Sequence, residues 1–207
     1  MASGPSTLRR NAVARYGTEH KEATRRRIVE SAGRRFKRDG IDGSGIATLM
    51  ADAGLTNGAF YAHFDSKDDL IATAVADQLR EQAEHLRALP PGKAGVEEFV
   101  RWYLSAEHRD GPEEGCPSAA LLDEIGRAQS TTRRVFTEGL LVSNEELATR
   151  VAAEDPQSVQ AQVLSVFALL VGTVQLSRAL DDRQLADEVL ERGIENALAL
   201  LSAADRR

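Results

Sequence analysis

Apolar residues recur at intervals of three and four positions along most of this chain of 207 residues. This period is typical of helices that bury one face. Ile28, Ala32 and Phe36 form the first such stripe, and arginines and lysines occupy the faces beside it. The sequence lacks paired runs of alternating apolar and polar residues around a hairpin turn. We therefore predict an all-α fold.

Glycines and capping residues divide the N-terminal part of this pattern into short helices. The first helix is predicted over about 20–39. Ser44 is expected to cap a second helix, which stops at Gly54. Thr56 can cap a short third helix over 57–64. These three helices are followed by a much longer one.

The fourth helix has the clearest start signal in the chain. Ser66 is the predicted N-cap, and Asp69 stands at the capping-box position. The helix runs to about Leu89, before two prolines and a glycine. Later helices are predicted at about 94–108, 117–128, 130–154, 157–180 and 184–203, which makes about nine helices in total.

The second and third predicted helices form a helix-turn-helix, and the first helix supports them. Gly54 supplies the positive φ that the turn requires. The third helix carries small residues, which would let its backbone approach the major groove of DNA. They are Asn57, Gly58, Ala59 and Ala62.

The distribution of charge is compatible with contact to phosphates, although the net charge of the chain is −6. Residues 1–38 hold eleven Lys and Arg against three Glu, whereas residues 70–207 hold 14 basic against 23 acidic residues. A basic segment on an acidic body can still be attracted to nucleic acid. Taken alone, such a segment is equally typical of a solvated helix face.

One segment closely resembles the DNA-binding signature of the tetracycline-repressor (TetR) family. It reads GIDGSGIA over 40–47 and AGLTNGAFYAHFDSKDDL over 53–70. The resemblance implies a homodimeric repressor that binds a palindromic operator and is released by a small-molecule inducer. Met50 departs from the family pattern, which usually has a small alanine there, and this indicates slightly altered packing.

The resemblance and the side-chain chemistry together assign DNA contacts. Thr56, Tyr61 and His63 have polar tips suited to phosphate oxygens, whereas the amide of Asn57 can read a base edge. Without the surrounding signature, Tyr61 and His63 would be interpreted as ordinary polar residues of a helical bundle. The expected set is Arg27, Ser44, Gly45, Thr56, Asn57, Gly58, Ala59, Tyr61, His63 and Lys67, with sequence-independent attraction from Arg9, Arg10 and Arg15.

Periodicity and the resemblance together divide the chain. Residues 1–18 are expected to form a flexible basic arm, 19–66 the helix-turn-helix DNA-binding domain, and 67–207 a helical regulatory and dimerisation domain. Apolar stripes near the C-terminus could form the dimer interface, although the same stripes could face only the core of their own chain. They contain Val159, Val163, Val166, Leu170, Val174, Leu190, Ile194, Leu198 and Leu201.

An effector pocket is expected among the middle helices, where most of the candidate side chains would otherwise be ordinary core. The candidates are Phe99, Trp102, Tyr103, His108, Cys116, Leu121, Phe136, Leu140, Phe167 and Gln175. Cys116 precedes a predicted helix start, where the helix dipole favours a thiolate, while Glu113 and Glu114 oppose it. A thiol- or electrophile-responsive repressor is therefore an alternative, and a small residue filling a joint is the plainer interpretation of Cys116.

Other function classes find less support in the sequence. An enzyme is not expected, because the four histidines lack metal-site spacing and no phosphate-loop or nucleophile-elbow motif occurs. No cofactor or metal is expected, and one cysteine cannot form an internal disulfide. Polar residues interrupt the longest apolar stretch, so we expect no membrane contact and a cytoplasmic location. A non-specific, nucleoid-type DNA binder remains a further alternative.

Overall fold

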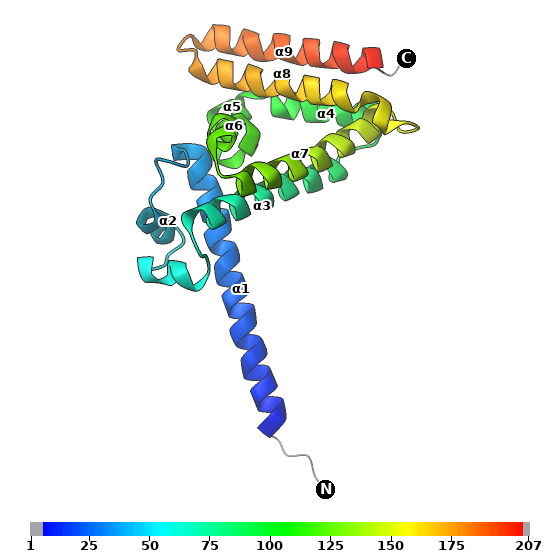
Figure 1. The fold of residues 1–207 in the computed structure, drawn as a ribbon. Helices are drawn as coiled ribbons and strands as arrows, with labels where there is room; N and C mark the ends of the chain where they lie inside the picture. Colours follow the sequence, from blue (N-terminus) through cyan, green and yellow to red (C-terminus); the bar gives the residue numbers. More distant parts are fainter. Residues whose placement is uncertain (1–5, 205–207) are drawn as a thin grey trace.

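The computed structural model describes the backbone of residues 6–204 and the side chains of residues 19–202. Within these bounds the chain is helical and contains no strand, so the predicted all-α class is confirmed (Figure 1). The α-helices are α1 (Ser6–Asp39), α2 (Ile46–Asp52), α3 (Lys67–Ala88), α4 (Gly92–Tyr103), α5 (Ala106–Asp110), α6 (Pro117–Arg127), α7 (Ser130–Val151), α8 (Gln160–Ala179) and α9 (Arg183–Ala204). Three short 3-10 segments are η1 (Asn57–Ala62), η2 (Pro112–Glu114) and η3 (Pro156–Val159).

Helix α1 begins at Ser6, well before the predicted start near His20. The expectation of a flexible arm over 1–18 therefore does not match residues 6–18, whose backbone is helical, while residues 1–5 lie outside the described part. Leucine, alanine and arginine, which favour helix, make up six of the thirteen residues at 6–18, and extending an existing helix avoids the cost of nucleating a new one. Figure 1 shows this end of α1 projecting away from the body.

Three other elements differ from the predicted pattern. The third helix is a 3-10 segment rather than an α-helix. The helix predicted over 94–108 is divided into α4 and α5, because the hydroxyl of Ser105 accepts a hydrogen bond from the amide of His108 and caps a new helix. The predicted cap Ser44 is replaced by Gly45, since the Ser44 hydroxyl donates instead to the Gly40 carbonyl at 2.7 Å.

Two apolar clusters hold the fold together. The N-terminal cluster joins α1, α2, η1 and the first half of α3, and it includes Phe36, Phe60 and Phe64. Leu121 of α6 and Phe136 of α7 belong to the same cluster, so the helix-turn-helix shares its core with the body. Burying each such side chain contributes on the order of 1.5–3 kcal/mol. The helix-turn-helix is therefore held against the helices behind it.

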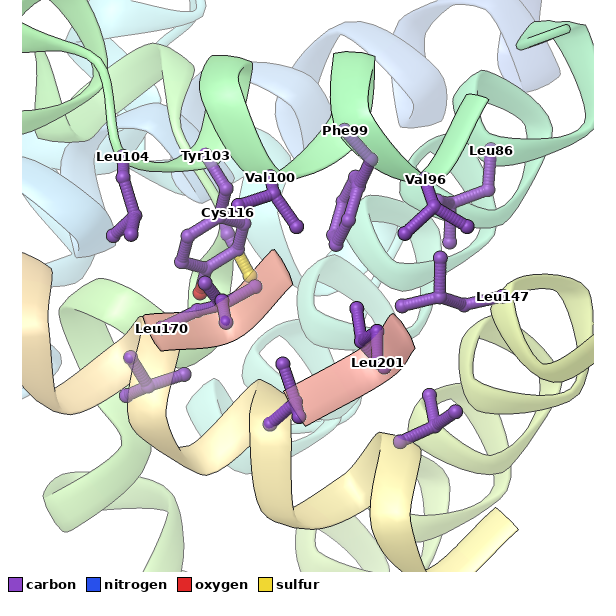
Figure 2. Close-up of a cluster of buried hydrophobic side chains, with 14 of the residues drawn as sticks. Leu86, Val96, Phe99, Val100, Tyr103, Leu104, Cys116, Leu147, Leu170 and Leu201 are labelled. Atoms are coloured by element: carbon purple, nitrogen blue, oxygen red, sulfur yellow. The ribbon is translucent and has the colours of Figure 1, made fainter. Parts of the chain in front are cut away.

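The second cluster lies between α4, α7, α8 and α9, with the C-terminal end of α3 (Figure 2). Phe99, Val100 and Tyr103 of α4 face Leu170 of α8 and Leu201 of α9. Helices α8 and α9 run side by side along their lengths, and α7 packs along α3 (Figure 1). Helix α3 thus begins beside the helix-turn-helix and ends inside the body.

Candidate nucleic-acid interface

The reading segment η1 is anchored by one aromatic side chain. Phe60 is fully buried, stacks with Phe64 at a centroid distance of 5.8 Å, and meets the edge of Tyr61 at 5.1 Å. Phe60 faces inward, whereas Tyr61 after it faces solvent. Tyr61 is 71% exposed, which is unusual for an aromatic side chain in a protein of this size.

Five of the ten predicted DNA contacts lie at the start of η1 or within it. Thr56, Asn57, Gly58 and Tyr61 are exposed and Ala59 is half-buried. Thr56 precedes η1 with extended backbone angles, as a capping residue does, but no cap hydrogen bond from its side chain is formed among the described residues. Its hydroxyl can therefore bind another partner. The structure brings these residues together on one small, nearly uncharged surface.

The turn before η1 has the geometry that the sequence predicts. Gly54 has φ +68°, and its amide donates to the Ala51 carbonyl at 2.9 Å. The next amide, from Leu55, donates to the Met50 carbonyl at 2.9 Å. These bonds satisfy the last carbonyls of α2, and glycine adopts the left-handed conformation without the strain of a Cβ.

Two other predicted contacts are already engaged within the chain. The Lys67 ammonium donates to the Ile41 carbonyl at 2.6 Å, and Lys67 is half-buried. Ser44 is fully buried, and its amide donates to the same carbonyl at 3.3 Å. Gly45, in contrast, is exposed at the start of α2, and Arg27 is exposed on α1. Ser44 and Lys67 therefore hold the α1–α2 turn in shape.

His63 is half-buried, and its Nδ1 has no hydrogen-bond partner within residues 19–202. Burial lowers the pKa of His63, and the nearby charges of Lys21 and Arg25 lower it further. At neutral pH the imidazole is therefore uncharged. Any contact of His63 with DNA would be a neutral hydrogen bond rather than an ion pair.

Sequence reasoning missed the basic side chains that fasten the reading element. The guanidinium of Arg25 lies 4.6 Å from the centre of the Phe64 ring, a cation–π contact. Arg35 of α1 forms an ion pair with Asp52 of α2 and lowers the pKa of that carboxylate. Arg35 also pairs with Asp39, and this pair could have been found from its spacing of four residues. The pairing with Asp52 has no local signal.

The predicted pocket residues are divided between the two clusters. Phe99, Tyr103 and Cys116 are buried in the second cluster, and Phe167 packs against it. Leu121, Phe136 and Leu140 belong to the cluster behind the helix-turn-helix instead. Trp102 is 36% exposed and stacks on His108 with centroids 5.2 Å apart, while Gln175 is exposed on α8.

Cys116 is buried within a chain of hydrogen bonds. Its thiol donates to Oε1 of Gln82 at 3.2 Å, and its amide donates to Nε2 of His108 at 3.0 Å. Because Nε2 accepts, the proton of His108 is on Nδ1, which donates to the Tyr103 carbonyl at 2.6 Å. Burial lowers the pKa of His108, which favours this neutral form. Tyr103 lies beside the sulfur (Figure 2), and burial raises the pKa of its hydroxyl.

The residues predicted for the dimer interface lie in the core of their own chain in the described structure, which is the alternative that the periodicity left open. They belong to α8, α9 and η3. Most of them are buried in this core, and Ile194 and Leu198 are half-buried. Helical period identifies an apolar face but does not say which partner covers it. The outward face carries Leu176, Leu185 and Leu200, which are exposed by 54%, 44% and 47%.

Helix α8 has apolar residues on both of these faces. By length and composition, Pro156–Ala179 is the one described helix that could cross a membrane, a test that core helices also pass. Its mean hydropathy over the most apolar window is 1.7, yet only 33% of that window is buried inside the chain. Among the described residues, no cluster of histidine, cysteine or acidic side chains could hold a metal ion.

The sequence of the N-terminal region is similar to that of known regulatory proteins. Residues 28–74 match the family model of bacterial regulatory proteins of the tetR family. The HTH-type transcriptional regulator TtgR of Pseudomonas putida is 36% identical over 74 residues, as is the probable HTH-type transcriptional regulator ArpR of the same species. The match covers 36% of this chain and 35% of each relative, so the chain spans about a third of the length of these relatives.

Similarity to solved structures extends over most of the chain. The reduced form of E. coli NemR has a TM-score of 0.73 at 16% sequence identity, and the superposed residues make up 84% of this chain and 95% of the NemR chain. A TetR-family regulator from Cytophaga hutchinsonii gives 0.70 at 22% identity, with 87% and 95% covered. Another from Streptomyces coelicolor gives 0.61 at 26% identity, with 86% and 96% covered. The signature at residues 40–70 lies within the matched region, and most of the fold is shared with TetR-family regulators, so residues 28–74 of this chain form a DNA-binding domain of the tetR family.

Proposed function

We propose that this protein is a repressor that binds a palindromic operator as a homodimer and releases it when a small molecule binds the helical body. One observation carries the proposal: the exposed, small-residue surface of η1 is anchored by Phe60 on a core that the DNA-binding helices share with α6 and α7. A change in the body can therefore move the reading segment.

In this proposal the exposed face of η1 enters the major groove. Asn57 reads a base edge, Gly58 and Ala59 allow close approach, and Thr56 and Tyr61 bind phosphates on either side. Arg27 and the N-terminal arginines add attraction that is independent of sequence. Lys67 holds the α1–α2 turn in place, because its ammonium is engaged with the Ile41 carbonyl. His63 contributes a neutral hydrogen bond, because its imidazole is uncharged.

A dimer is required because one segment of six residues contacts too few base pairs to specify a site. The outward face of α8 and α9 is suited to a second copy. Leu176, Leu185 and Leu200 are exposed there, and α8 is apolar beyond what its own chain covers. Two antiparallel helices from each chain would form a four-helix interface. The division at about residue 66 into a DNA-binding and a regulatory domain, and a cytoplasmic location, belong to the same proposal.

Footprinting tests the proposal. The purified full chain is incubated at about 0.15 M salt with DNA from upstream of its own gene and of the neighbouring genes. A discrete protected site with two-fold symmetry is expected. Uniform coverage that weakens steeply with salt would favour a non-specific nucleoid-type binder instead. Absence of protection at any concentration would overturn the proposal and reopen the question of catalysis.

A second candidate, a thiol-responsive repressor, is favoured by the environment of Cys116. The sulfur sits at the N-cap of α6, bonded to Gln82, and the Lys37 ammonium lies nearby, donating to the Gly115 carbonyl at 2.8 Å. NemR, a structural neighbour, was solved in a form described as reduced. Oxidation of Cys116 by hydrogen peroxide to a sulfenic acid, with release of water, would break the bond to Gln82.

The substitution Cys116→Ser separates the two candidates. If the thiol senses oxidants, peroxide releases the wild-type protein from its operator and leaves the variant bound. Equal release of both proteins, or of neither, would rule out sensing by Cys116. Under reducing conditions the variant should bind the operator as the wild type does, which shows that the substitution leaves the fold intact.

A further inference from the structure

An open cleft of about 260 Å³ lies between α1 and the body. Residues of α1 line one side of it and residues of α3 the other, and Trp102 of α4 and the turn from η2 to α6 complete the lining. Acidic side chains outnumber basic ones there. The acidic residues are Glu30, Asp77, Glu81 and Glu114, and the basic residues are Arg34 and Lys37. The cleft is therefore a small acidic space where the DNA-binding helices meet the body.

The side chain of Lys37 is half-buried in this cleft and is held at one point. Its Nζ donates a hydrogen bond to the Gly115 carbonyl at 2.8 Å. Gly115 fits there because it has no side chain: a Cβ would lie 2.4 Å from Cδ2 of His108. Within residues 19–202 no carboxylate forms an ion pair with Lys37, although acidic groups lie nearby. The nitrogen is thus positioned by a carbonyl and remains available to a molecule in the cleft.

The surroundings of Lys37 favour its uncharged form. Burial lowers the pKa of the Lys37 ammonium, and the neighbouring acidic groups offset this only in part. The charged and titratable groups that face it are Glu114 and Cys116 at the turn, Glu81 on α3, Arg34 on α1 and His108 on α5. A buried lysine with a lowered pKa holds more free amine at neutral pH, and the free amine is the form that attacks a carbonyl carbon.

The carboxyl group of Glu81 is changed in the complementary direction. Partial burial raises the pKa of Glu81, and the charge of Asp77 raises it further. Glu81 lines the same cleft as Lys37, and the two charges interact. A carboxyl group with a raised pKa can donate a proton near neutral pH. The cleft thus contains both a nucleophilic amine and a proton donor.

We propose that Lys37 is a covalent binding site for a small uncharged aldehyde or ketone, which it holds in the cleft as a Schiff base. The amine adds to the carbonyl carbon, so that a C–N bond forms and the carbonyl oxygen takes a proton from Glu81. The nitrogen then returns one proton to the Glu81 carboxylate. Glu81 passes this proton to the new hydroxyl, the C–O bond breaks and water leaves, which produces a protonated imine. No oxidant or reductant is needed.

The cleft also selects the class of carbonyl compound. Because its acidic residues outnumber the basic ones, an anionic aldehyde would be repelled. Trp102, which is 36% exposed in the cleft, offers an apolar contact to an uncharged molecule. The adduct would lie between α1 and the turn that begins α6, at the bond from Lys37 to Gly115. Its effect on operator binding rests on the proposed repressor function.

Reductive trapping tests the site on the full chain, without DNA. The protein is incubated with benzaldehyde, sodium cyanoborohydride reduces any imine to a stable secondary amine, and peptide mass spectrometry measures the rate at each lysine. The four lysines are Lys21, Lys37, Lys67 and Lys93. At about pH 7, Lys37 should be labelled at least about tenfold faster than the exposed Lys93, and at about pH 10 the difference should disappear. Equal labelling of Lys37 and Lys93 at about pH 7 would overturn the proposal.

A charged aldehyde tests the selectivity of the cleft. With 4-carboxybenzaldehyde, labelling of Lys37 should be slower than with benzaldehyde, while Lys93 should react alike with both. A preference of Lys37 for the carboxylate would show that the assigned class of ligand is wrong.

A matched pair of variants tests the proton donor. Glu81→Gln should slow labelling of Lys37 about tenfold or more. Loss of the Glu81 charge alone would lower the pKa of Lys37 further and speed the reaction, so a slower reaction reports proton donation. Glu84→Gln is the control, since Glu84 is exposed on the same helix, is bonded to Arg80 and lies outside the cleft lining. Equal rates in both variants would refute the role of Glu81. Thermal unfolding verifies that both variants fold.

A third variant separates the lysine from the neighbouring thiol. Cyanoborohydride does not reduce a hemithioacetal, so a molecule held by Cys116 is not trapped. Cys116→Ser should therefore leave labelling of Lys37 unchanged. Loss of the Lys37 label in this variant would show that the thiol captures the aldehyde, and would refute the site.

The footprinting experiment keeps this inference distinct from the proposed function. If the protein protects an operator but Lys37 is not labelled selectively, the repressor proposal stands and the Schiff-base site is refuted. If Lys37 is labelled but no operator is found, the site stands and the repressor proposal fails. If both succeed, trapping should change the operator affinity of the wild type but not that of Lys37→Arg, and an unchanged wild-type affinity would refute a regulatory role of the site.

Discussion

The carboxylate of Glu124 accepts a hydrogen bond from the backbone amide of Ile41 at 3.0 Å, which joins α6 of the body to the turn between α1 and α2. The same oxygen also lies 3.4 Å from the amide of Asp42. Gly40, just before them, has φ +79°, and a Cβ there would lie 3.1 Å from this oxygen. One acidic side chain thus connects α6 to the turn before the second helix of the helix-turn-helix.

Replacement of Glu124 should weaken that connection. Glu124→Ala leaves the amide of Ile41 without its partner and is expected to lower the free energy of unfolding by about 1–3 kcal/mol. Operator affinity should fall as well, because the turn that orients α2 is released. Urea unfolding and fluorescence anisotropy measure the two effects. Asp123→Ala is the control, since Asp123 is exposed and pairs only with Arg127 in the described structure; equal effects of both variants would contradict this role.

Two neighbouring residues of η1 should have different effects on DNA binding. Tyr61→Ala is expected to weaken binding to every operator variant, because a phosphate contact carries no sequence information. Asn57→Ala should instead reduce discrimination at one base position, by about 1–3 kcal/mol. Anisotropy titrations against single-base operator variants make the comparison. If both substitutions lower all affinities in parallel, the division into base and phosphate contacts is wrong. Asn57 is exposed, so its substitution should leave stability unchanged, whereas Tyr61→Ala also removes the contact with Phe60 and should lower stability by about 0.5–1.5 kcal/mol.

A charge on the outward face of α8 should prevent dimerisation. Leu176→Arg places a guanidinium where the proposed partner packs, and sedimentation equilibrium should show a monomer with an unchanged helix content. Leu122→Arg is the matched control, because Leu122 is also exposed but lies on α6. A dimeric Leu176→Arg protein would exclude this face. Loss of the dimer in both variants would indicate a general effect of charge rather than a local interface.

Stability should decrease on mild acidification. The folded-state pKa of His108 lies below its usual value because the ring is buried, and that of His63 is lowered for the same reason. The unfolded chain therefore takes up protons that the folded chain does not. As a result, the free energy of unfolding falls as pH falls through the unfolded pKa near 6.5.

The slope of stability against pH tests this effect. It should reach at most about 1.4 kcal/mol per pH unit for each histidine. His108→Asn removes one titrating group and should flatten the slope between about pH 7.5 and about pH 5.5, while the slope due to His63 remains. Urea unfolding across this range measures it, and an identical slope in the variant would show that His108 does not contribute.

The helices and the reading element could be predicted from sequence because their signals are local. A period of three to four residues, Ser66 as a cap and Gly54 in a left-handed turn depend on residues that are close in the chain. The residues of the reading surface are similarly local, since Thr56 to Tyr61 lie on one segment. Arg35 with Asp39 could also be expected, as both lie on one helix face.

The burial of each apolar face and the capping of α2 depended on how the helices pack against one another. Val163 and Leu176 are both apolar residues of α8, and only packing shows that Val163 faces the core while Leu176 remains exposed. Ser44 could have capped α2 by its residue type, but the nearby Gly40 carbonyl takes its hydroxyl.

The sequence by itself determined the all-α class, the helix-turn-helix and its family, because these follow from short-range pattern and turn chemistry. The tertiary structure decided which apolar face is internal and how Glu124 reaches Ile41 across the domains. It also decided which charged groups line the cleft at Lys37. The reason is physical: local pattern sets helix and turn preferences, whereas burial, pairing and unsatisfied polar groups depend on residues that meet only after the chain has folded.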